Sequence, residues 1–262
     1  MNIVRATFRS AAVAVATLLL YLLFQAGRIV LFSLGRNTTV WRTSVVRVWA
    51  RTVAVVIGLT IEFRGEPPEP PFLLVSNHLS YLDIIPYFIA APSVFVAKNE
   101  IKGWPMLGRM AKGINIIFIN RQQKRDIPRV NRLIEENITD KQGIIIFPEG
   151  TTTRGERVKR FNSSLLQYAA AREFPVSYAA ITYELPRSES DKSVHEWVCW
   201  WGTMTFLAHF FKMLTLPSIR AVVTFGKEHI QHTDRKLLAR RLHNHVQAQF
   251  QPVSNKKEKI YG

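Results

Sequence analysis

The stretch that decides the fold reads FLLVSNHLSYLD and covers residues 72–83. Its first five residues form an apolar run that predicts a buried strand, and the pattern over 82–91 predicts a helix. The polar residues between them occupy a turn at the carboxyl end of a strand, where open α/β sheets often carry functional groups. His78 is the candidate for chemistry in this turn, because an imidazole can act as a general base near neutral pH.

A histidine base needs a partner that fixes its tautomer, and Asp83 is the candidate for that part. Residues five apart in a continuous α-helix lie about 140° apart around the axis. His78 must therefore lie in the turn before the helix in order to reach Asp83. A purely structural explanation stays open, because Ser80 and Asp83 have the spacing of a capping box.

Outward from this stretch, short apolar runs alternate with helical patterns. Further strands are predicted at 94–97, 114–119, 143–147, 176–183, 195–201 and 219–225, and further helices at 127–138, 163–172 and 236–250. This alternation indicates an α/β fold with a mixed, mostly parallel sheet flanked by helices. Hydrophobic residues make up 47% of the chain, which is enough for a packed core.

The N-terminus carries a segment suited to a membrane. Residues 10–27 contain no charged residue, and after Arg28 the apolar run continues over 29–34. A spanning helix needs about 20 apolar residues, so the length is borderline. Three interpretations stay open: a single span with Arg28 at the interface, a re-entrant hairpin, or a cleaved signal peptide. No small-residue cleavage site is apparent, which favours an uncleaved membrane helix.

Arginines flank the apolar segment, and more of them follow it than precede it. Arg5 and Arg9 come before it, and Arg28, Arg36, Arg42, Arg47 and Arg51 come after it. If the segment spans, this excess places the downstream chain on the cytoplasmic side. We expect the membrane to be the inner membrane of a bacterium. The next stretch, 41–59, has apolar residues at helical spacing with arginines between them. It fits an amphipathic helix at the headgroup boundary and a core helix with a basic face equally well.

Composition divides the chain into four parts. Residues 1–64 are expected to form the N-terminal membrane part, with the membrane helix and the interfacial helix. Residues 65–71 read GEPPEPP, which predicts a stiff linker. Residues 72–252 form the main α/β domain, and 253–262 form a polar tail that is expected to be loose.

The formal net charge of +16 attracts polyanions such as nucleic acid, anionic lipid headgroups or acidic carriers. No nucleic-acid-binding motif is recognised, and the apolar N-terminus favours lipid, so we expect a membrane partner and no nucleic acid. Cys199 is the single cysteine, which excludes a disulfide framework within one chain and a Cys-rich metal site. No metal-ligand spacing appears, so we expect no metal.

Two further stretches place useful groups at the ends of predicted strands. The sequence FPEGT, residues 147–151, brings the carboxylate of Glu149 to a strand end, where it can accept hydrogen bonds from a polyol; the alternative is a plain turn. The stretch 113–121 ends in Arg121, whose guanidinium can bind a phosphate through two parallel hydrogen bonds. The alternative is an ordinary surface arginine.

Together the three stretches resemble, in order and spacing, the glycerolipid acyltransferase family. Its best-known branch is 1-acyl-glycerol-3-phosphate (lysophosphatidic acid) acyltransferase. The first family block is Asn-His with an Asp after four intervening residues, here Asn77, His78 and Asp83. The second block ends in an arginine, here Arg121, and the third is FPEG, here 147–150.

The resemblance covers about residues 72–183, more loosely extends to 225, and includes the helix pair before the first block. Two positions depart from the family pattern. Asn120 stands where the second block usually has Asp, and Tyr178 falls where the fourth block usually has proline. These departures bear on the acceptor pocket more than on the reaction.

The resemblance implies transfer of a fatty acyl chain from acyl-CoA or acyl carrier protein to the free hydroxyl of 1-acyl-glycerol 3-phosphate. The product is phosphatidic acid for phospholipid biosynthesis. It implies His78 as the base and Asp83 as its orienting partner, with no cofactor besides the acyl donor. The substrate-binding residues it implies are Arg121 for the phosphate, Glu149 and Gly150 for the glycerol portion, and Gly113, Thr151 and Arg154.

Other functions stay open. The same chemistry on another lysolipid, such as lyso-ornithine lipid or a different lysophospholipid, fits the same blocks. A remote alternative is a non-enzymatic membrane protein that retains the fold.

Overall fold

The computed structural model describes residues 2–103, 107–120, 123, 126–189 and 191–253. Within them, seven strands form one sheet in the order β1-β7-β6-β2-β5-β3-β4. The strands are β1 Leu59–Arg64, β2 Leu73–Ser76, β3 Ser93–Lys98, β4 Ile117–Ile119, β5 Gly143–Ile146, β6 Val176–Glu184 and β7 Ile219–Phe225. All pairs are parallel except β6 with β7, which confirms the predicted mixed, mostly parallel sheet.

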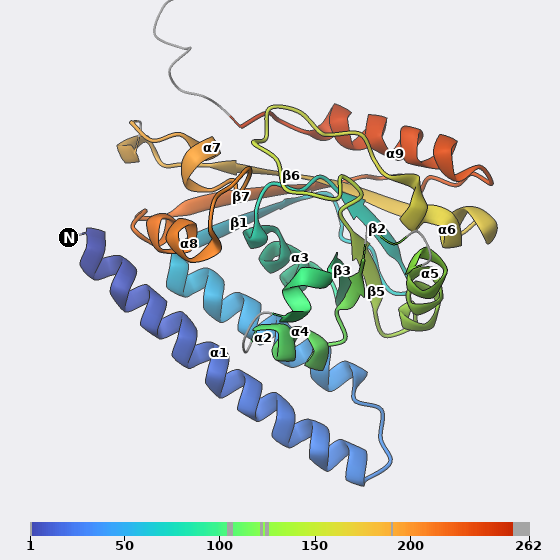
Figure 1. Cartoon of the computed structure of the whole chain (residues 1–262), viewed down its shortest axis with the longest axis horizontal. Helices are drawn as coiled ribbons and strands as arrows, with labels where there is room; N and C mark the ends of the chain where they lie inside the picture. Colours follow the sequence, from blue (N-terminus) through green and yellow to red (C-terminus); the bar gives the residue numbers. More distant parts are fainter. Residues whose placement is uncertain (1, 104–106, 121–122, 124–125, 190, 254–262) are drawn as a thin grey trace, which may run out of the picture.

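Strand β2 lies in the middle of the sheet between β5 and β6. Its residues are buried along the whole strand, as are those of β5. Parallel strands that are covered on both faces carry continuous apolar runs, which explains the sequences LLV and III. Helix α9 Arg235–Gln249 covers one face of the sheet, and α3 Ile84–Ala90 lies on the other (Figure 1). The turn after β2 therefore begins at the centre of the carboxyl edge.

Shorter helices complete both layers. They are α4 Leu107–Gly113, α5 Asp126–Asn137, α6 Gln167–Ala171, α7 Val194–Trp197 and α8 Phe206–Leu214, with 3-10 helices η1 Tyr81–Asp83, η2 Asn99–Gly103, η3 Ser163–Leu166 and η4 Arg187–Glu189. The predicted helix 82–91 thus begins as a 3-10 turn and continues as α3. The predicted helix 163–172 is likewise split between η3 and α6.

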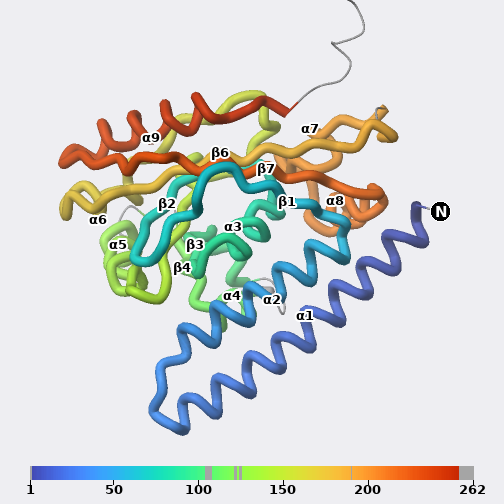
Figure 2. The backbone as a smooth tube through the Cα atoms, turned by 180° about the vertical axis from the view of Figure 1, so that it is seen from behind, coloured from blue at the N-terminus to red at the C-terminus, as the bar shows by residue number. Residues whose placement is uncertain are grey.

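The N-terminal helices α1 Asn2–Ser33 and α2 Thr39–Ile57 form an antiparallel hairpin beside the sheet (Figures 1 and 2). Two indole nitrogens of α2 bond the helices together: Trp49 Nε1 donates to Thr17 Oγ1 at 3.0 Å, and Trp41 Nε1 donates to the Phe24 carbonyl at 3.1 Å. The inner face of α2 packs on α3 and β1, as expected for a core helix, while Val55 on its outer face is 81% exposed.

By length and composition, α1 qualifies as a membrane-crossing helix, and 11% of its most apolar 18-residue window is buried in the protein. Its N-terminal end is bound to the segment after α8. Arg9 Nη1 donates to the Leu216 carbonyl at 2.6 Å, and Arg5 Nη1 donates to the Thr215 carbonyl at 3.0 Å. Because α2 runs back to β1, both ends of the hairpin lie at the main domain.

Strand β1 was not expected from the sequence, which indicated only helices before residue 65. Gly58 ends α2 in the left-handed conformation, with φ of 74°, and turns the chain into β1. Leu59 then pairs with Ile219 of β7, 160 positions away in the chain, and such a partner leaves no local signal. Residues 59–64 therefore belong to the sheet.

Two other predictions differ from the structure. The predicted strand 195–201 is wrong, because the chain forms α7 Val194–Trp197 and then an irregular segment. His195 explains this: its Nδ1 lies 2.5 Å from the Arg154 carbonyl oxygen, a contact to a distant loop. The predicted strand 114–119 is shorter, since Gly113 ends α4 and Asn115 has a positive φ of 64° before β4 begins. The predicted tail beyond 253 lies outside the described residues.

Candidate active site

The chain leaves β2 in a turn that is bonded to β6. The Asn77 side chain pairs with the Ile181 backbone: its Nδ2 donates to the carbonyl at 2.9 Å, and its Oδ1 accepts from the amide at 2.8 Å. Asn77 is 1% exposed, so both polar ends of the amide are satisfied inside the protein. This pairing fixes the direction in which the following residue, His78, leaves the sheet.

His78 lies in this turn and Asp83 at the end of η1, the arrangement that the five-residue spacing required. His78 Nδ1 lies 2.7 Å from Asp83 Oδ2. The same oxygen accepts the backbone amides of Leu79 at 2.7 Å and Ser80 at 3.1 Å. The catalytic and capping explanations are therefore compatible, because one carboxylate both caps the 3-10 turn and contacts the imidazole. Asp83 is fully buried.

Asp83 has a further partner that the sequence did not indicate. The hydroxyl of Tyr183 in β6 donates to Asp83 Oδ1 at 2.7 Å. Burial raises the pKa of Tyr183 well above its ordinary value, with the nearby Asp83 charge as a second cause, so the hydroxyl keeps its proton. A tyrosine in a mostly apolar strand needs a partner for its hydroxyl when it is buried, and this was the only sequence signal for the contact.

The imidazole of His78 is oriented from two sides. Its ring stacks on Phe147 with centroids 4.1 Å apart and planes 6° apart. The His78 side chain is 20% exposed, and among the described residues its Nε2 has no hydrogen-bond partner. The nitrogen opposite Asp83 is thus the one that can meet a substrate.

Glu149 holds the backbone of the same turn. One carboxylate oxygen accepts the His78 amide at 2.7 Å, and the other accepts the Lys159 amide at 2.9 Å. The His78 carbonyl accepts the Thr153 amide at 3.0 Å, so His78 is bonded at both backbone atoms. Glu149 is 6% exposed, and burial raises its pKa to about 7, although the two amides lower it.

The remaining predicted site residues lie at different distances from this centre. Gly150 follows Glu149 with a positive φ of 78°, which a glycine adopts without strain. Thr151 is half-buried in the same loop. Arg154 is exposed and lies over the Trp201 ring at 4.6 Å. Gly113 lies against Tyr21 and Phe24 of α1. Arg121 lies outside the described residues.

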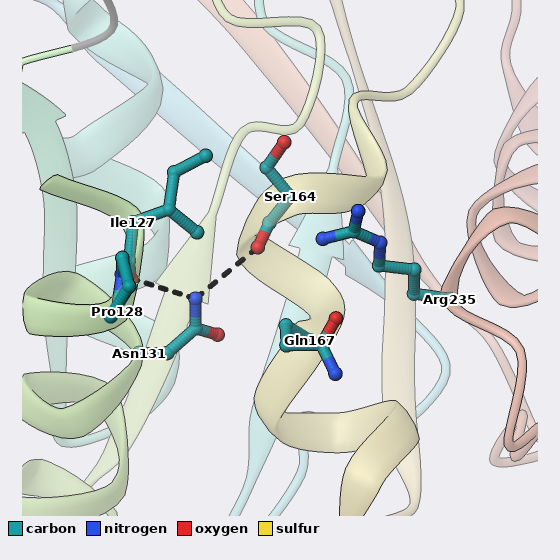
Figure 3. A pocket seen from close by; sticks show the side chains of 6 residues that line it. All are labelled: Ile127, Pro128, Asn131, Ser164, Gln167 and Arg235. Atoms are coloured by element: carbon teal, nitrogen blue, oxygen red, sulfur yellow. Dashed lines mark hydrogen bonds between the residues drawn. The ribbon is translucent and has the colours of Figure 1, made fainter. Parts of the chain in front are cut away.

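The described residues contain no group of three or more His, Cys, Asp and Glu side chains placed to hold a metal ion. The structure also has a surface cavity of about 550 Å³ between α5, η3 and α6, next to the start of α9. Figure 3 shows its lining, in which Asn131 Nδ2 donates to the carbonyls of Ile127 and Ser164. None of the predicted site residues lines this cavity.

The comparisons with known proteins agree with this geometry. The family model described as Acyltransferase matches residues 60–182, which include the turn, Glu149 and most of β6. Together with a relative that is 30% identical and covered over 70% of its length, described next, this match shows that the chain belongs to the acyltransferase family.

Among its relatives is the lyso-ornithine lipid O-acyltransferase of Rhizobium meliloti, 30% identical over 206 residues, which are 74% of this chain and 70% of that protein. Another is the 1-acyl-sn-glycerol-3-phosphate acyltransferase of Neisseria meningitidis, 36% identical over 135 residues. That match spans 51% of this chain and about half (53%) of the relative.

A solved structure has the same fold. It is the 1-acyl-sn-glycerophosphate (LPA) acyltransferase PlsC from Thermotoga maritima, with a TM-score of 0.59 over 90% of this chain and 97% of that one. The two sequences are 18% identical, so this likeness supports the fold alone.

Proposed function

We propose that the protein transfers a fatty acyl chain from an acyl thioester to the free hydroxyl of a lysolipid at a membrane surface. The single observation that carries this proposal is the buried contact between His78 Nδ1 and Asp83 Oδ2 at 2.7 Å, with Nε2 on the accessible side of the ring. An imidazole held in this way can act as a general base and take the proton of the acceptor hydroxyl. The hydroxyl is then the nucleophile, so the reaction needs no nucleophile from the protein.

In the proposed reaction, His78 Nε2 takes the proton of the acceptor hydroxyl while the hydroxyl oxygen attacks the thioester carbonyl. Asp83 holds the proton on Nδ1 and stabilises the imidazolium that forms, as the acid does in a hydrolase triad. The tetrahedral intermediate then collapses, the carbon–sulfur bond breaks, and the thiolate takes the proton from Nε2. An ester and a free thiol leave, and the histidine returns to its starting state.

The acceptor that we propose first is 1-acyl-glycerol 3-phosphate. In this proposal Arg121 binds its phosphate, and Glu149 and Gly150 position its glycerol portion. Gly113, Thr151 and Arg154 are the further substrate-binding residues that the family pattern implies. The two amides that Glu149 accepts support a role in shaping the loop that receives the acceptor.

A second acceptor, lyso-ornithine lipid, is favoured by the extent of the matches. The Rhizobium meliloti relative covers 74% of this chain, and the Neisseria meningitidis relative covers 51%. Asn120 and Tyr178 depart from the family pattern, which is consistent with an acceptor other than 1-acyl-glycerol 3-phosphate. The reaction at His78 is the same for both acceptors.

We also propose that the helix hairpin enters the inner membrane of a bacterium from the cytoplasmic side. Most of the apolar surface of α1 is exposed, and an exposed helix of this kind needs lipid around it. Both hairpin ends lie at the main domain, which favours the re-entrant interpretation over a single span. The donor is acyl-CoA or acyl carrier protein, both of which are anionic and suit the basic chain.

The test is acyl transfer by the purified full chain in mixed lipid–detergent micelles. A labelled acyl group is supplied on CoA or on carrier protein, and 1-acyl-glycerol 3-phosphate, lyso-ornithine lipid and lysophosphatidylethanolamine are offered separately. We expect a labelled diacyl product from at least one of the first two acceptors, and about 10³-fold slower product formation with His78→Ala. The absence of product from every pairing would overturn the proposal, and equal product from His78→Ala would overturn the mechanism.

A further inference from the structure

Helix α8 Phe206–Leu214 carries apolar side chains on two sides. On its inner side, Phe206 and Phe210 pack on Tyr81 of η1, with ring centroids 5.0 and 6.1 Å apart. On its outer side, Leu207 is 76% exposed and Phe211 is 39% exposed. The helix thus connects the turn that holds Asp83 with an apolar outer surface.

Helix α8 lies beside the start of α1, which also has exposed apolar side chains. The two helices are in contact, and Arg5 and Arg9 bond the start of α1 to the carbonyls that follow α8. Figures 1 and 2 show α8 beside the N-terminal end of α1 from both directions. In that part of α1, Ile3, Val4 and Phe8 are 70–73% exposed. Exposed apolar side chains gathered on two neighbouring helices indicate an interaction site.

A basic and aromatic edge borders this surface. Lys192 Nζ lies 4.9 Å and Lys212 Nζ 4.5 Å from the centre of the Trp197 ring. Lys192 pairs with Glu189, and Lys212 donates to the exposed Glu196 carbonyl. Tryptophan sits at the headgroup level of membranes, and Lys212 beside it can turn to the lipid phosphates. The neighbouring surface of α1 is long, apolar and exposed, and such a helix needs lipid around it, so a lipid leaflet is the partner that we infer for α8.

We propose that α8 is a second membrane-contacting element, which inserts Leu207 and Phe211 at the headgroup boundary of the leaflet that holds α1. An acceptor lipid in that leaflet then meets the protein next to Tyr81 and the catalytic turn. The proposal rests on the proposed function for the identity of the acceptor. The test measures how deeply α8 lies in the bilayer, so this proposal and the proposed function can fail separately.

The experiment places a single fluorescent label on the full chain reconstituted in vesicles of phosphatidylcholine and phosphatidylglycerol. The native Cys199 is fully buried, so labels go to introduced cysteines. Leu207→Cys tests α8, Leu19→Cys on the exposed side of α1 is the lipid reference, and Ala248→Cys, exposed on α9, is the aqueous reference. Phe211→Cys serves as the second α8 position.

We expect brominated lipid to quench the labels at 207 and 211 as it quenches the label at 19, and several-fold more than the label at 248. Aqueous iodide should show the reverse order. If the labels at 207 and 211 behave like the one at 248, the proposal is overturned. The acyl-transfer assay is run on the unaltered protein in the same vesicles, and the absence of product from every donor and acceptor pairing would reject the proposed function without changing the depth measurement.

A second inference rests on Tyr183, whose hydroxyl donates to Asp83 Oδ1 at 2.7 Å. The other carboxylate oxygen already receives two amides and contacts His78, so Tyr183 alone bonds Oδ1 among the described side chains. We infer that Tyr183 is a positioning residue, which fixes the rotation of the carboxylate and shares its negative charge.

Tyr183→Phe removes this donor and keeps the ring. The Asp83 charge is then less satisfied and stabilises the His78 imidazolium more strongly, so the acid limb of the pH–rate profile should shift to higher pH. We expect kcat to fall about tenfold, because the Asp83 carboxylate can then rotate and no longer holds the His78 imidazole in one orientation.

Tyr87→Phe is the matched control, because Tyr87 is as deeply buried, 1% exposed, but donates its hydroxyl to Ser76. It should lower stability to a similar extent and leave the acid limb where it is. If the acid limb does not move in Tyr183→Phe, or moves equally in both variants, Tyr183 is a structural residue only and the inference is overturned.

Discussion

The turn 77–83 and helix α1 differ in how their side chains are satisfied. In the turn, the Asp83 carboxylate is fully buried and has four partners inside the protein. In α1, by contrast, Leu19 is 60% exposed and Phe8 is 72% exposed, although both are strongly apolar. The polar groups of the turn thus find their partners within the protein, whereas the apolar side chains of α1 need an apolar environment outside it.

This difference separates chemistry from location. A buried charge with several donors keeps one geometry, because each donor left without its partner is costly. An apolar helix surface tolerates many arrangements as long as water is excluded. Changes in the turn should therefore alter the rate and leave the membrane affinity unchanged. Changes in the attachment of α1 should leave the rate unchanged. The predictions below test this separation, from the largest expected effect to the smallest.

The largest effect is expected for His78→Ala. Loss of the general base should lower kcat/KM about 10³-fold, while sedimentation with lipid vesicles should be unchanged. His78→Gln is the companion variant, because it keeps a polar side chain in the partly exposed position. The separation would fail if either variant lost vesicle binding together with activity.

Asp83→Asn comes next. In Asp83→Asn, the new NH2 group faces partners that are themselves hydrogen-bond donors. We therefore expect kcat to fall about 10²-fold and the free energy of unfolding to fall by about 3 kcal/mol. Initial rates and urea unfolding in micelles measure the two effects. Asp234→Asn makes the same chemical change at the exposed N-cap of α9 and should alter neither, since Asn is an equally good cap. A loss of rate without any loss of stability would contradict the buried hydrogen-bond arrangement of Asp83.

Much of this turn could be predicted from the sequence because its signals are local. The five-residue spacing of His78 and Asp83 requires a turn before a helix, and the apolar run 72–76 requires a central strand. Glu149 was found from its place at the end of another strand. The second oxygen of Asp83 could not be assigned, because Tyr183 lies 100 positions away and nothing local connects them.

The sequence failed where a distant partner decides the local structure. Strand β1 exists because Leu59 meets Ile219, and 195–201 is not a strand because His195 contacts the Arg154 carbonyl. Arg5 and Arg9 were counted as charges flanking a membrane segment, yet they donate to carbonyls after α8. Short apolar runs and single charges have several stable environments, and tertiary contacts select among them.

The third prediction concerns Glu149, which joins the turn to the following loop. Burial raises its pKa to about 7 from 4.5, so the folded protein binds this proton more tightly than the unfolded chain. Stability should therefore fall as pH rises from about 4.5 to about 7, by on the order of 3 kcal/mol. Glu149→Gln should remove this part of the slope, as measured by urea unfolding in micelles across that range.

Glu156→Gln is the control for this slope, because Glu156 lies in the same loop with an exposed side chain. It should follow the pH dependence of the unaltered protein. If Glu149→Gln and the unaltered protein had the same slope, Glu149 would already be ionised at low pH, and the His78 and Lys159 amides would outweigh its burial.

The smallest effect is expected for Arg9→Ala, which tests how α1 is attached. Arg9 donates to the Leu216 carbonyl at 2.6 Å and to the Pro217 carbonyl at 3.0 Å. Because its side chain is partly exposed, the substitution should lower the free energy of unfolding by about 1 kcal/mol. Hydrogen exchange should then speed up in the first turns of α1, and kcat on micellar acceptor should change less than twofold, by about the uncertainty of the assay. Arg36→Ala removes the same charge from the exposed loop between α1 and α2 and should leave exchange unchanged. If Arg9→Ala lowered kcat as far as Asp83→Asn does, the start of α1 would be coupled to the catalytic turn through α8 and Tyr81, and the two regions could not be treated as separate.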